Sequence, residues 1–558
     1  MPTTSLLDQF LAAIARLHSR SMTRKFFRAV SCATGTQDRV LADVFASGSE
    51  SDFAQTHGLA SVRTYRDFAD RVPIQTYADL APHIERVRNG DVRALFSPGE
   101  RILMFALTSG TTAQPKYIPI TRRALADYRA GWNIWGVKAI LDHPGCLLRH
   151  IVQVTSPMND HVAPSGVPCG AISGLLAATQ KKLVRKYYTS PLAIAAISDS
   201  TAKYYAIMRM AVPKDVGWLV TANPATLLVL ARSADEHRET LIRDIHDGTM
   251  TNAMNVEPAI RDALAPLMKP NTQRARELEQ IIRRTGSLYP KDYWRLGFLA
   301  HWTGGTMGLY RTQFPKFFGD TPARDIGLVA SEGRMSIPLD DGTASGVLAV
   351  ASQFFEFIPA NEYGTTKPST LRSHELTVGE EYFLLLTNFS GLYRYDLGDR
   401  VRVTGYMGGA PMIEFLSRDA HTSSLAGEKL TENQVVLAME KATSGGESIT
   451  NFILSPRWAE VPFYRLYVDA AAVRDVTTLA ARLDRELCTT NIEYDSKRKT
   501  LRLGPVEVVA LPENRLAERD HNLRAQRART AEQFKHQYLL SRPGLDADLD
   551  SMRAMQKA

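Results

Sequence analysis

The sequence predicts an α/β fold in two domains, on three observations. The chain has 558 residues, too many for one hydrophobic core. Apolar strand-like runs such as GWLVTA and GVLAVAS alternate with amphipathic stretches such as PATLLVLARSADEH. Near Ser417 the order of elements changes to a compact α+β pattern. We therefore expect a large N-terminal domain, residues 1–417, and a small C-terminal α+β domain, residues 418–558.

The first hundred residues are expected to be mainly helical. Apolar residues recur at helical spacing in LLDQFLAAIARL and in FADRVPIQTYADLAPHIERV, where Pro73 and Pro82 should punctuate the helices. Asp8 and Arg16 interrupt the first of these stretches and no cleavage site follows, so it reads as a helix rather than a signal peptide.

Strands dominate the end of the N-terminal domain. The runs YFLLLTN, LYRYDLGD, RVRVTGYM and MIEFLS are separated by Gly, Asn and Asp turns, which indicates a meander of four strands. Beyond it come the helix ENQVVLAMEKA, the strands ITNFILS and FYRLYVDA, the helix TTLAARLDREL and the strand GPVEVVAL. This order is that of a separate α+β unit.

The bulk composition excludes several classes of protein. With 44% hydrophobic and 23% charged residues, the chain is neither disordered nor fibrous. A net charge of +8 would suit nucleic acid, an anionic membrane or a phosphate-rich substrate, but spread over this length it is equally that of a solvated basic surface. Four scattered cysteines give no disulfide or zinc pattern. We expect a cytoplasmic protein, with neither nucleic acid nor membrane as a partner.

The segment 108–116, TSGTTAQPK, holds the strongest chemical signal. Small residues let the backbone approach an anion, four hydroxyls can surround phosphate oxygens, and Lys116 adds a positive charge. The spacing is not that of a Walker loop. An ordinary hydroxyl-rich turn has a similar composition.

Two acidic residues complete a possible nucleotide site. Glu332 follows an apolar run and could hold Mg²⁺ beside phosphates, although an isolated glutamate after a strand is more often a solvated charge. Asp399 ends LYRYDLGD and could accept both ribose hydroxyls, or it could belong to a plain turn.

The three elements in this order resemble the adenylate-forming superfamily, whose loop reads TSGTTGxPK. Further stretches make the chain similar to the Gretchen Hagen family of acyl acid-amido synthetases. They include HGLASVRTYRDF near residue 57, YYTSP, IRDIHDGTM, TGGTM, FFEFIP and LYRYDLGDRVRVTGY, and together they cover nearly the whole chain. The resemblance implies that ATP and Mg²⁺ activate a carboxylic acid as an acyl-adenylate. An amine, expected to be an amino acid, then receives the acyl group. It also implies a β-barrel-like part in the large domain, a mobile C-terminal domain and a monomer.

The resemblance carries roles over to individual residues. Lys116, Lys429 and Lys535 would be catalytic, Arg418 would lie at the interdomain hinge, Glu332 would ligate Mg²⁺, and Asp399 would hold the ribose. Further nucleotide contacts are implied for Thr108, Ser109, Gly110, Thr111, Thr112, Gly304, Gly305, Ala330 and Ser331.

Two departures from the family pattern stand out. Gln114 and Pro115 stand where plant members carry a glycine and acidic or basic residues, and an aliphatic residue, Leu328 or Val329, stands where the family has an aromatic that stacks on adenine. Ala113 also replaces one glycine of the superfamily loop. For the acyl acid we expect a pocket built by Arg123, Tyr128, Trp132 and Trp135 and by residues around 166–173, although aromatics at helical spacing equally suit a core. No histidine can be singled out as the base for the amine.

Two alternatives remain open from the sequence. An acyl-CoA ligase would share the adenylation step but deliver the acyl group to a thiol. A non-catalytic nucleotide-binding or nucleic-acid-binding protein could keep the loop without turnover, and the Arg-rich segment 515–529 would be its best support.

Overall fold

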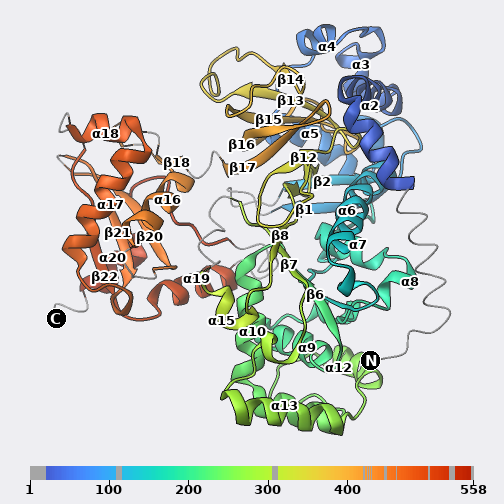
Figure 1. Ribbon diagram of the computed structural model, residues 1–558. Coiled ribbons are helices and arrows are strands. Elements are labelled where there is room, and N and C mark those ends of the chain that lie inside the picture. Colours follow the sequence, from blue (N-terminus) through green and yellow to red (C-terminus); the bar gives the residue numbers. More distant parts are fainter. Residues whose placement is uncertain are drawn as a thin grey trace. The chain divides into compact units, whose positions relative to one another are not determined.

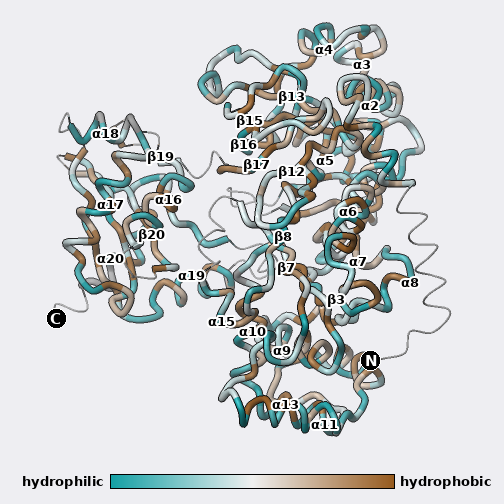
Figure 2. Tube along the Cα trace, in the orientation of Figure 1, coloured by the Kyte–Doolittle hydropathy of each residue, from teal (hydrophilic) through white to brown (hydrophobic). Residues whose placement is uncertain are grey.

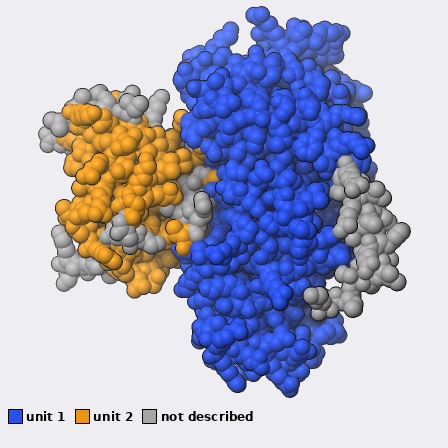
Figure 3. Space-filling model, in the orientation of Figure 1, with its two compact units in different colours: residues 1–303, 313–397, 401–415 blue, residues 304–312, 398–400, 416–558 orange. Residues whose placement is uncertain are grey.

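The computed structural model describes most of the chain (Figure 1). The described residues are 21–108, 116–304, 312–418, 422–423, 425–426, 428, 430–444, 449–459, 461–499, 503–526 and 535–554. They form two compact units, coloured separately in Figure 3. Unit 1 contains residues 1–303, 313–397 and 401–415, and unit 2 contains residues 304–312, 398–400 and 416–558. The predicted α/β class is confirmed.

The described part of unit 1 begins with helices, as predicted, whereas the predicted helix LLDQFLAAIARL lies outside the described residues. Residues 21–31 are helical, and α2 (Ala33–Gly48), α3 (Asp52–Thr56), α4 (Tyr65–Arg71) and α5 (Tyr77–Arg88) follow. The expectation that Pro82 ends a helix is wrong, because Pro82 lies inside α5. Leu80, Ile84 and Val87 are buried along this helix. Their packing offsets the lost backbone hydrogen bond.

Two four-stranded sheets follow in unit 1. The first has the order β2-β1-β5-β4 and the second the order β3-β6-β7-β8. Their strands are β1 (Ile102–Thr108), β2 (Lys116–Thr121), β3 (His150–Gln153), β4 (His161–Val162), β5 (Pro168–Gly170), β6 (Val216–Val220), β7 (Phe298–His301) and β8 (Ala323–Asp325). The second sheet is parallel throughout. Its strand β6 is buried at every residue, which explains the unbroken apolar run in the sequence.

Helices connect and cover these strands. They are α6 (Arg122–Asp142), α7 (Ile172–Ala178), α8 (Lys182–Arg185), α9 (Ser200–Ala211), α10 (Pro224–Glu236), α11 (Arg238–Asp247), α12 (Pro258–Leu264), α13 (Thr272–Thr285), α14 (Pro290–Tyr293) and α15 (Phe314–Phe318). Helix α13 shows hydrophobic and hydrophilic stretches side by side in Figure 2. It buries Ala275 and Leu278, as an amphipathic surface helix does.

The third sheet of unit 1 has seven strands in the order β11-β12-β17-β16-β15-β13-β14. They are β11 (Ser336–Ile337), β12 (Gly346–Leu348), β13 (Phe354–Pro359), β14 (Leu371–Arg372), β15 (Glu381–Thr387), β16 (Tyr395–Met407) and β17 (Ala410–Arg418). The neighbours β15, β16 and β17 form the predicted meander. The predicted turn at Gly398 is wrong, since β16 runs through it with Gly398 at φ 69°. Glycine adopts this left-handed conformation without a steric penalty.

Unit 2 has its own sheet and core. Strands β20 (Phe452–Arg457), β21 (Phe463–Asp469) and β22 (Glu507–Leu511) form the sheet, antiparallel and then parallel. Around it lie β18 (Thr422–Ser423), β19 (Leu430–Thr431), α16 (Glu432–Ala442), α17 (Val476–Thr490), α18 (Ile492–Lys499), α19 (Arg515–Gln526) and α20 (Ala547–Ala554). Val435, Leu466 and Leu483 are buried in one apolar cluster. Across the part of the chain that is described, no helix is long and apolar enough to cross a bilayer.

Candidate active site

The ends of strands β1 and β2 fix where the predicted phosphate loop begins and ends. Thr108 ends β1, Lys116 begins β2, and the two residues pair across the antiparallel ladder. The segment between them therefore connects two hydrogen-bonded strands. Ser109, Gly110, Thr111 and Thr112 lie outside the described residues.

Two tyrosines surround the ammonium group of Lys116. Its Nζ lies 3.4 Å from the hydroxyl of Tyr395, the first residue of β16, and 5.4 Å from the ring centroid of Tyr77. The hydroxyl of Tyr77 accepts a hydrogen bond of 2.8 Å from the backbone N–H of Tyr117. Because a cation is attracted to the face of an aromatic ring, this arrangement holds the charge of Lys116 beside the loop.

Glu332 lies in a tight hairpin rather than at the end of a long strand. Strand β9 (Val329–Ala330) and strand β10 (Gly333–Arg334) pair antiparallel, and Ser331 and Glu332 form the turn. The hydroxyl of Ser331 lies 3.5 Å from the carbonyl oxygen of Leu107 in β1, so the hairpin lies next to the strand that leads into the loop. Glu332 is only 5% exposed, which disfavours the alternative of a solvated surface charge.

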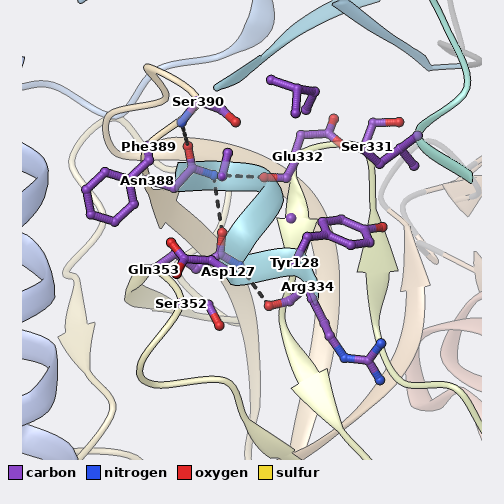
Figure 4. Close-up of a pocket in the computed structure, with 14 residues that line it drawn as sticks. Asp127, Tyr128, Ser331, Glu332, Arg334, Ser352, Gln353, Asn388, Phe389 and Ser390 are labelled. Atoms are coloured by element: carbon purple, nitrogen blue, oxygen red, sulfur yellow. Dashed lines mark hydrogen bonds between the residues drawn. The ribbon is translucent and has the colours of Figure 1, made fainter. Parts of the chain in front are cut away.

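A hollow opens between this hairpin and helix α6 (Figure 4). Ser331, Glu332 and Arg334 line it from the hairpin, and Asp127 and Tyr128 from the helix. The remaining lining residues are Ile120, Ala124, Ile172, Gly333, Ser352, Gln353, Asn388, Phe389 and Ser390.

Asn388 organises one wall of this hollow. Its amide nitrogen donates to the carbonyl oxygen of Glu332 at 2.8 Å and to Oε1 of Gln353 at 3.2 Å, as the dashed lines in Figure 4 mark. Gln353 in turn donates to the carbonyl oxygen of Arg334 at 3.1 Å. On the opposite side the hydroxyl of Tyr128 donates to the carbonyl oxygen of Ala330 at 3.0 Å. Hydrogen bonds from two sides thus fix the hairpin backbone that carries Glu332.

Asp127 is the lining residue with the most unusual acidity. Burial raises the pKa of its carboxyl to about 7, and the guanidinium of Arg123, with Nε 3.2 Å from Oδ2, opposes that rise. Arg123 also lies over the ring of Phe389, 4.7 Å from its centroid. The predicted substrate residue Arg123 therefore contacts two lining residues, Asp127 and Phe389, but does not itself line the hollow. Its partner Asp127 is an acid that the sequence did not single out.

The two tryptophans predicted for an acyl pocket have different surroundings. Trp135 is 1% exposed and its indole N–H donates to the carbonyl oxygen of Asp325 at 2.7 Å, so it belongs to the core. Trp132 is half-buried, and its ring packs edge-on against Trp135 with centroids 5.4 Å apart.

The predicted ribose-binding segment is anchored by a buried ion pair. Arg394 donates from Nε to Oε1 of Glu356 at 2.9 Å, and both side chains are at most 6% exposed. Its Nη1 also donates to the carbonyl oxygens of Ala69 and Val72. Arg394 has a φ of 45°, uncommon for a residue with a side chain. The ion pair thus stabilises a backbone turn immediately before Tyr395.

The remaining predicted residues are placed as follows. Asp399 is 1% exposed within β16, in the short segment that groups with unit 2. Gly304 is at a bend and Lys535 is exposed. Arg418 ends β17, and nothing is described of its side chain. Gly305 and Lys429 lie outside the described residues. The structure therefore brings Ser331, Glu332 and Tyr128 to one hollow and leaves the other assignments as predictions.

The sequence could have pointed to part of what was missed. Asp127 follows Arg123 by four residues, so a helical wheel places it next to Arg123. Asn388 and Gln353 lie in loops far from the motifs, and only the fold brings them to Glu332.

Models of the three domains of one protein family match most of the chain. The GH3 family N-terminal, central and C-terminal domains match residues 22–323, 346–418 and 433–543. The jasmonoyl–L-amino acid synthetase JAR4 of Nicotiana attenuata is 25% identical over 78% of this chain and 76% of its own length. The indole-3-acetic acid-amido synthetase GH3.3 of Arabidopsis thaliana is 24% identical over 85% of this chain and 84% of its own.

Solved structures show the same fold. The GH3.15 acyl acid amido synthetase superposes with a TM-score of 0.82 at 20% identity, covering 95% of both chains. A 2-hydroxyisobutyryl-CoA ligase in the postadenylation state gives 0.52 at 13% identity, over 94% of this chain and 92% of its own. Fold and relatives define an amide-forming ligase of the adenylate-forming class. The chain belongs to the GH3 family.

Proposed function

We propose that this enzyme adenylates a carboxylic acid with ATP and transfers the acyl group to the amine of an amino acid, acting as a cytoplasmic monomer. The observation that carries the proposal is the ordered match of all three GH3 family domains, because the curated relatives are amino acid-conjugating synthetases. The four cysteines, all in the described part, are free thiols, which is in keeping with a reducing compartment.

In the first step an oxygen of the substrate carboxylate attacks the α-phosphorus of ATP, and pyrophosphate leaves. The transition state gathers negative charge, so fixed positive groups accelerate it. Lys116 supplies such a charge, and Tyr77 and Tyr395 hold it beside the loop. We assign Thr108 to Thr112, Gly304, Gly305, Ala330, Ser331 and Asp399 to the nucleotide, as the family resemblance implies.

The residues at the hairpin fit a magnesium ion that arrives with ATP. Mg²⁺ binds one or two carboxylates together with phosphate oxygens, rather than a cage of protein ligands. Glu332 offers a single carboxylate at the hollow, and no cluster of three metal-ligating side chains occurs in the described ranges. When bound, the ion would neutralise phosphate charge. Glu332 would hold it, fixed by the hydrogen bond from Asn388 to its backbone.

In the second step the amine nitrogen attacks the acyl carbon and AMP leaves. The amine must first lose a proton. His301 is poorly suited to accept it, because burial lowers the pKa of its imidazole to about 4. We assign Lys535, Lys429 and the hinge residue Arg418 to unit 2 and its rotation between the steps, as the superfamily resemblance implies.

Pyrophosphate exchange tests the proposal. Carboxylate-dependent incorporation of labelled pyrophosphate into ATP should occur, and Lys116→Ala should weaken it without unfolding the protein. An amide should then form from an acid and an amino acid without coenzyme A. A thioester formed in its place would support a CoA ligase, and absence of exchange across a broad panel of acids would refute the enzyme.

A further inference from the structure

The guanidinium of Arg334 is buried with two of its three nitrogens lacking an acceptor among the described residues, although the charge of Asp325 is near enough to oppose the fall in its pKa. Arg334 is 1% exposed, and only its Nη2 makes a hydrogen bond, 2.6 Å to the carbonyl oxygen of Ile326. Its Nε and Nη1 have no acceptor among the described residues. Burial lowers the pKa of this group to about 10, which leaves it charged at neutral pH. A buried cation with unpaired donors is costly unless something binds it.

A second unpaired donor lies beside it. The guanidinium carbon of Arg334 is 4.5 Å from the centroid of the Trp132 ring. The indole N–H of Trp132 is also buried without an acceptor in the described part of the chain. Donors from strand β10 and helix α6 therefore lie side by side. Native proteins rarely leave such donors unsatisfied.

Helix α6 is shaped to admit this arginine. Gly131 lies in the middle of the helix, where glycine destabilises it relative to alanine. A Cβ at Gly131 would lie 2.3 Å from Cδ of Arg334. The glycine therefore makes room for the Arg334 side chain, which leaves the hairpin in the direction away from Asn388 (Figure 4).

The position of Arg334 relative to Glu332 indicates which part of a bound ligand these donors would contact. Arg334 follows Glu332 by two residues, and two residues of extended chain span at most about 7 Å. Helix α6 and the hairpin also line the hollow. A ligand in the hollow whose reacting carboxyl lies near Glu332 would thus meet Arg334 with a different group, a few ångströms away.

We propose that the acyl acid carries a second acceptor, a carboxylate, which binds the free N–H groups of Arg334 and Trp132. The inference rests on the proposed function and names its substrate class. A planar guanidinium suits a carboxylate, since two parallel N–H bonds can form. The α-carboxylate of the amino acid could supply the same acceptor, and buried water could satisfy the N–H groups instead.

Pyrophosphate exchange without any amine isolates the acid. We compare pairs of acids differing in the second group: 4-carboxybenzoate with 4-methylbenzoate, and hexanedioate with hexanoate. Wild type should favour the diacid at least ten-fold in kcat/KM in one pair. Arg334→Met should remove that preference by lowering kcat/KM for the diacid far more than for the monoacid, and Arg334→Lys should keep part of the preference. Trp132→Phe, which keeps an aromatic ring but loses the N–H donor, should lower the preference for the diacid several-fold.

Several outcomes would overturn the inference. A wild-type enzyme that prefers neither diacid over its monoacid refutes the inferred second carboxylate. This measurement does not depend on the folding of any variant. If Arg334→Met lowers exchange with both acids equally and also lowers the Tm, Arg334 has a structural role and buried water satisfies its N–H groups. A preference for glycine over glycinamide that vanishes in Arg334→Met, with no effect on exchange, assigns the site to the amine. If no acid of either kind supports exchange, the proposed function itself fails.

Discussion

The hydroxyl of Tyr395 lies 3.4 Å from Nζ of Lys116, so a single atom can be removed to test the positioning of that charge. Tyr395→Phe keeps the buried ring and deletes one hydrogen bond, which contributes about 1 kcal/mol. We expect pyrophosphate exchange to fall about five-fold, with the Tm within a few degrees of wild type.

Tyr406→Phe is the matched control. Tyr406 is also on β16, but away from Lys116, and its hydroxyl donates to the carbonyl oxygen of Leu376 at 2.8 Å. It should leave exchange unchanged. Equal losses in the two variants would mean that the hydroxyl of Tyr395 acts only on stability.

Asp127 makes the stability of the protein depend on pH. Burial raises the pKa of its carboxyl to about 7, against about 3.9 in an unfolded chain. Between these values the native state binds the proton more tightly, so this group's contribution to the free energy of unfolding is full below pH 4 and falls as pH rises to 7. Asp127→Asn removes the titration. Urea unfolding should show the variant gaining stability relative to wild type between pH 5 and pH 8.

Asp340→Asn provides the comparison, since that carboxylate is 69% exposed. The free energy of unfolding of Asp340→Asn should differ from that of wild type by the same amount at pH 5 and at pH 8. An Asp127→Asn difference that shrinks from pH 5 to pH 8 would contradict the buried, raised pKa.

At the scale of residues, sequence reasoning finds those whose chemistry is written in a local pattern. Lys116 and Glu332 belong to short motifs, and Glu332 lies at the hollow. Asp127 was missed because its raised pKa comes from burial, which depends on the fold. Arg334 was missed because a basic residue next to a motif resembles a solvated charge. Gly131, next to aromatics at helical spacing, was the available signal of a close approach.

Among the elements, strand β16 depends most on a distant anchor. Its first residue follows Arg394, whose buried guanidinium pairs with Glu356 on β13. Glu356→Gln keeps the shape but leaves a buried cation without its counter-charge, which costs about 3 kcal/mol. Urea unfolding should show this loss, and pyrophosphate exchange should fall because β16 carries Tyr395.

Glu381→Gln supplies the control on the neighbouring strand β15. Glu381 pairs with Arg402, which is 40% exposed, and a pair of this kind contributes at most about 1 kcal/mol. Similar losses for the two variants would show that the Arg394 ion pair has no special role.

Elements with strong periodicity were predicted well, and those with local conflict were not. The expected helix ENQVVLAMEKA coincides with α16, which has a capping box at Thr431 and Gln434. The predictions at Pro82 and Gly398 were wrong because each residue is locally unfavourable in its element. Tertiary packing holds Pro82 in α5, and strand pairing holds Gly398 in β16. Local propensity is a weak prior where the core decides.

For the whole molecule, the two compact units with separate apolar clusters suit an enzyme with two half-reactions. Unit 2 carries Lys535, assigned by resemblance to adenylation alone. If unit 2 rotates between the steps, Lys535 serves the first and leaves the second unaffected. Lys535→Ala should therefore lower pyrophosphate exchange at least ten-fold. Release of AMP from a chemically prepared acyl-adenylate plus amino acid should proceed at the wild-type rate.

Lys499→Ala is the control within the same unit, because Lys499 is 74% exposed and pairs with Asp495 on the surface of α18. It should change neither half-reaction, since a solvated ion pair contributes little. Equal losses of Lys535→Ala in both half-reactions would contradict a lysine that serves adenylation alone. They would instead favour a unit 2 that keeps one position throughout the cycle.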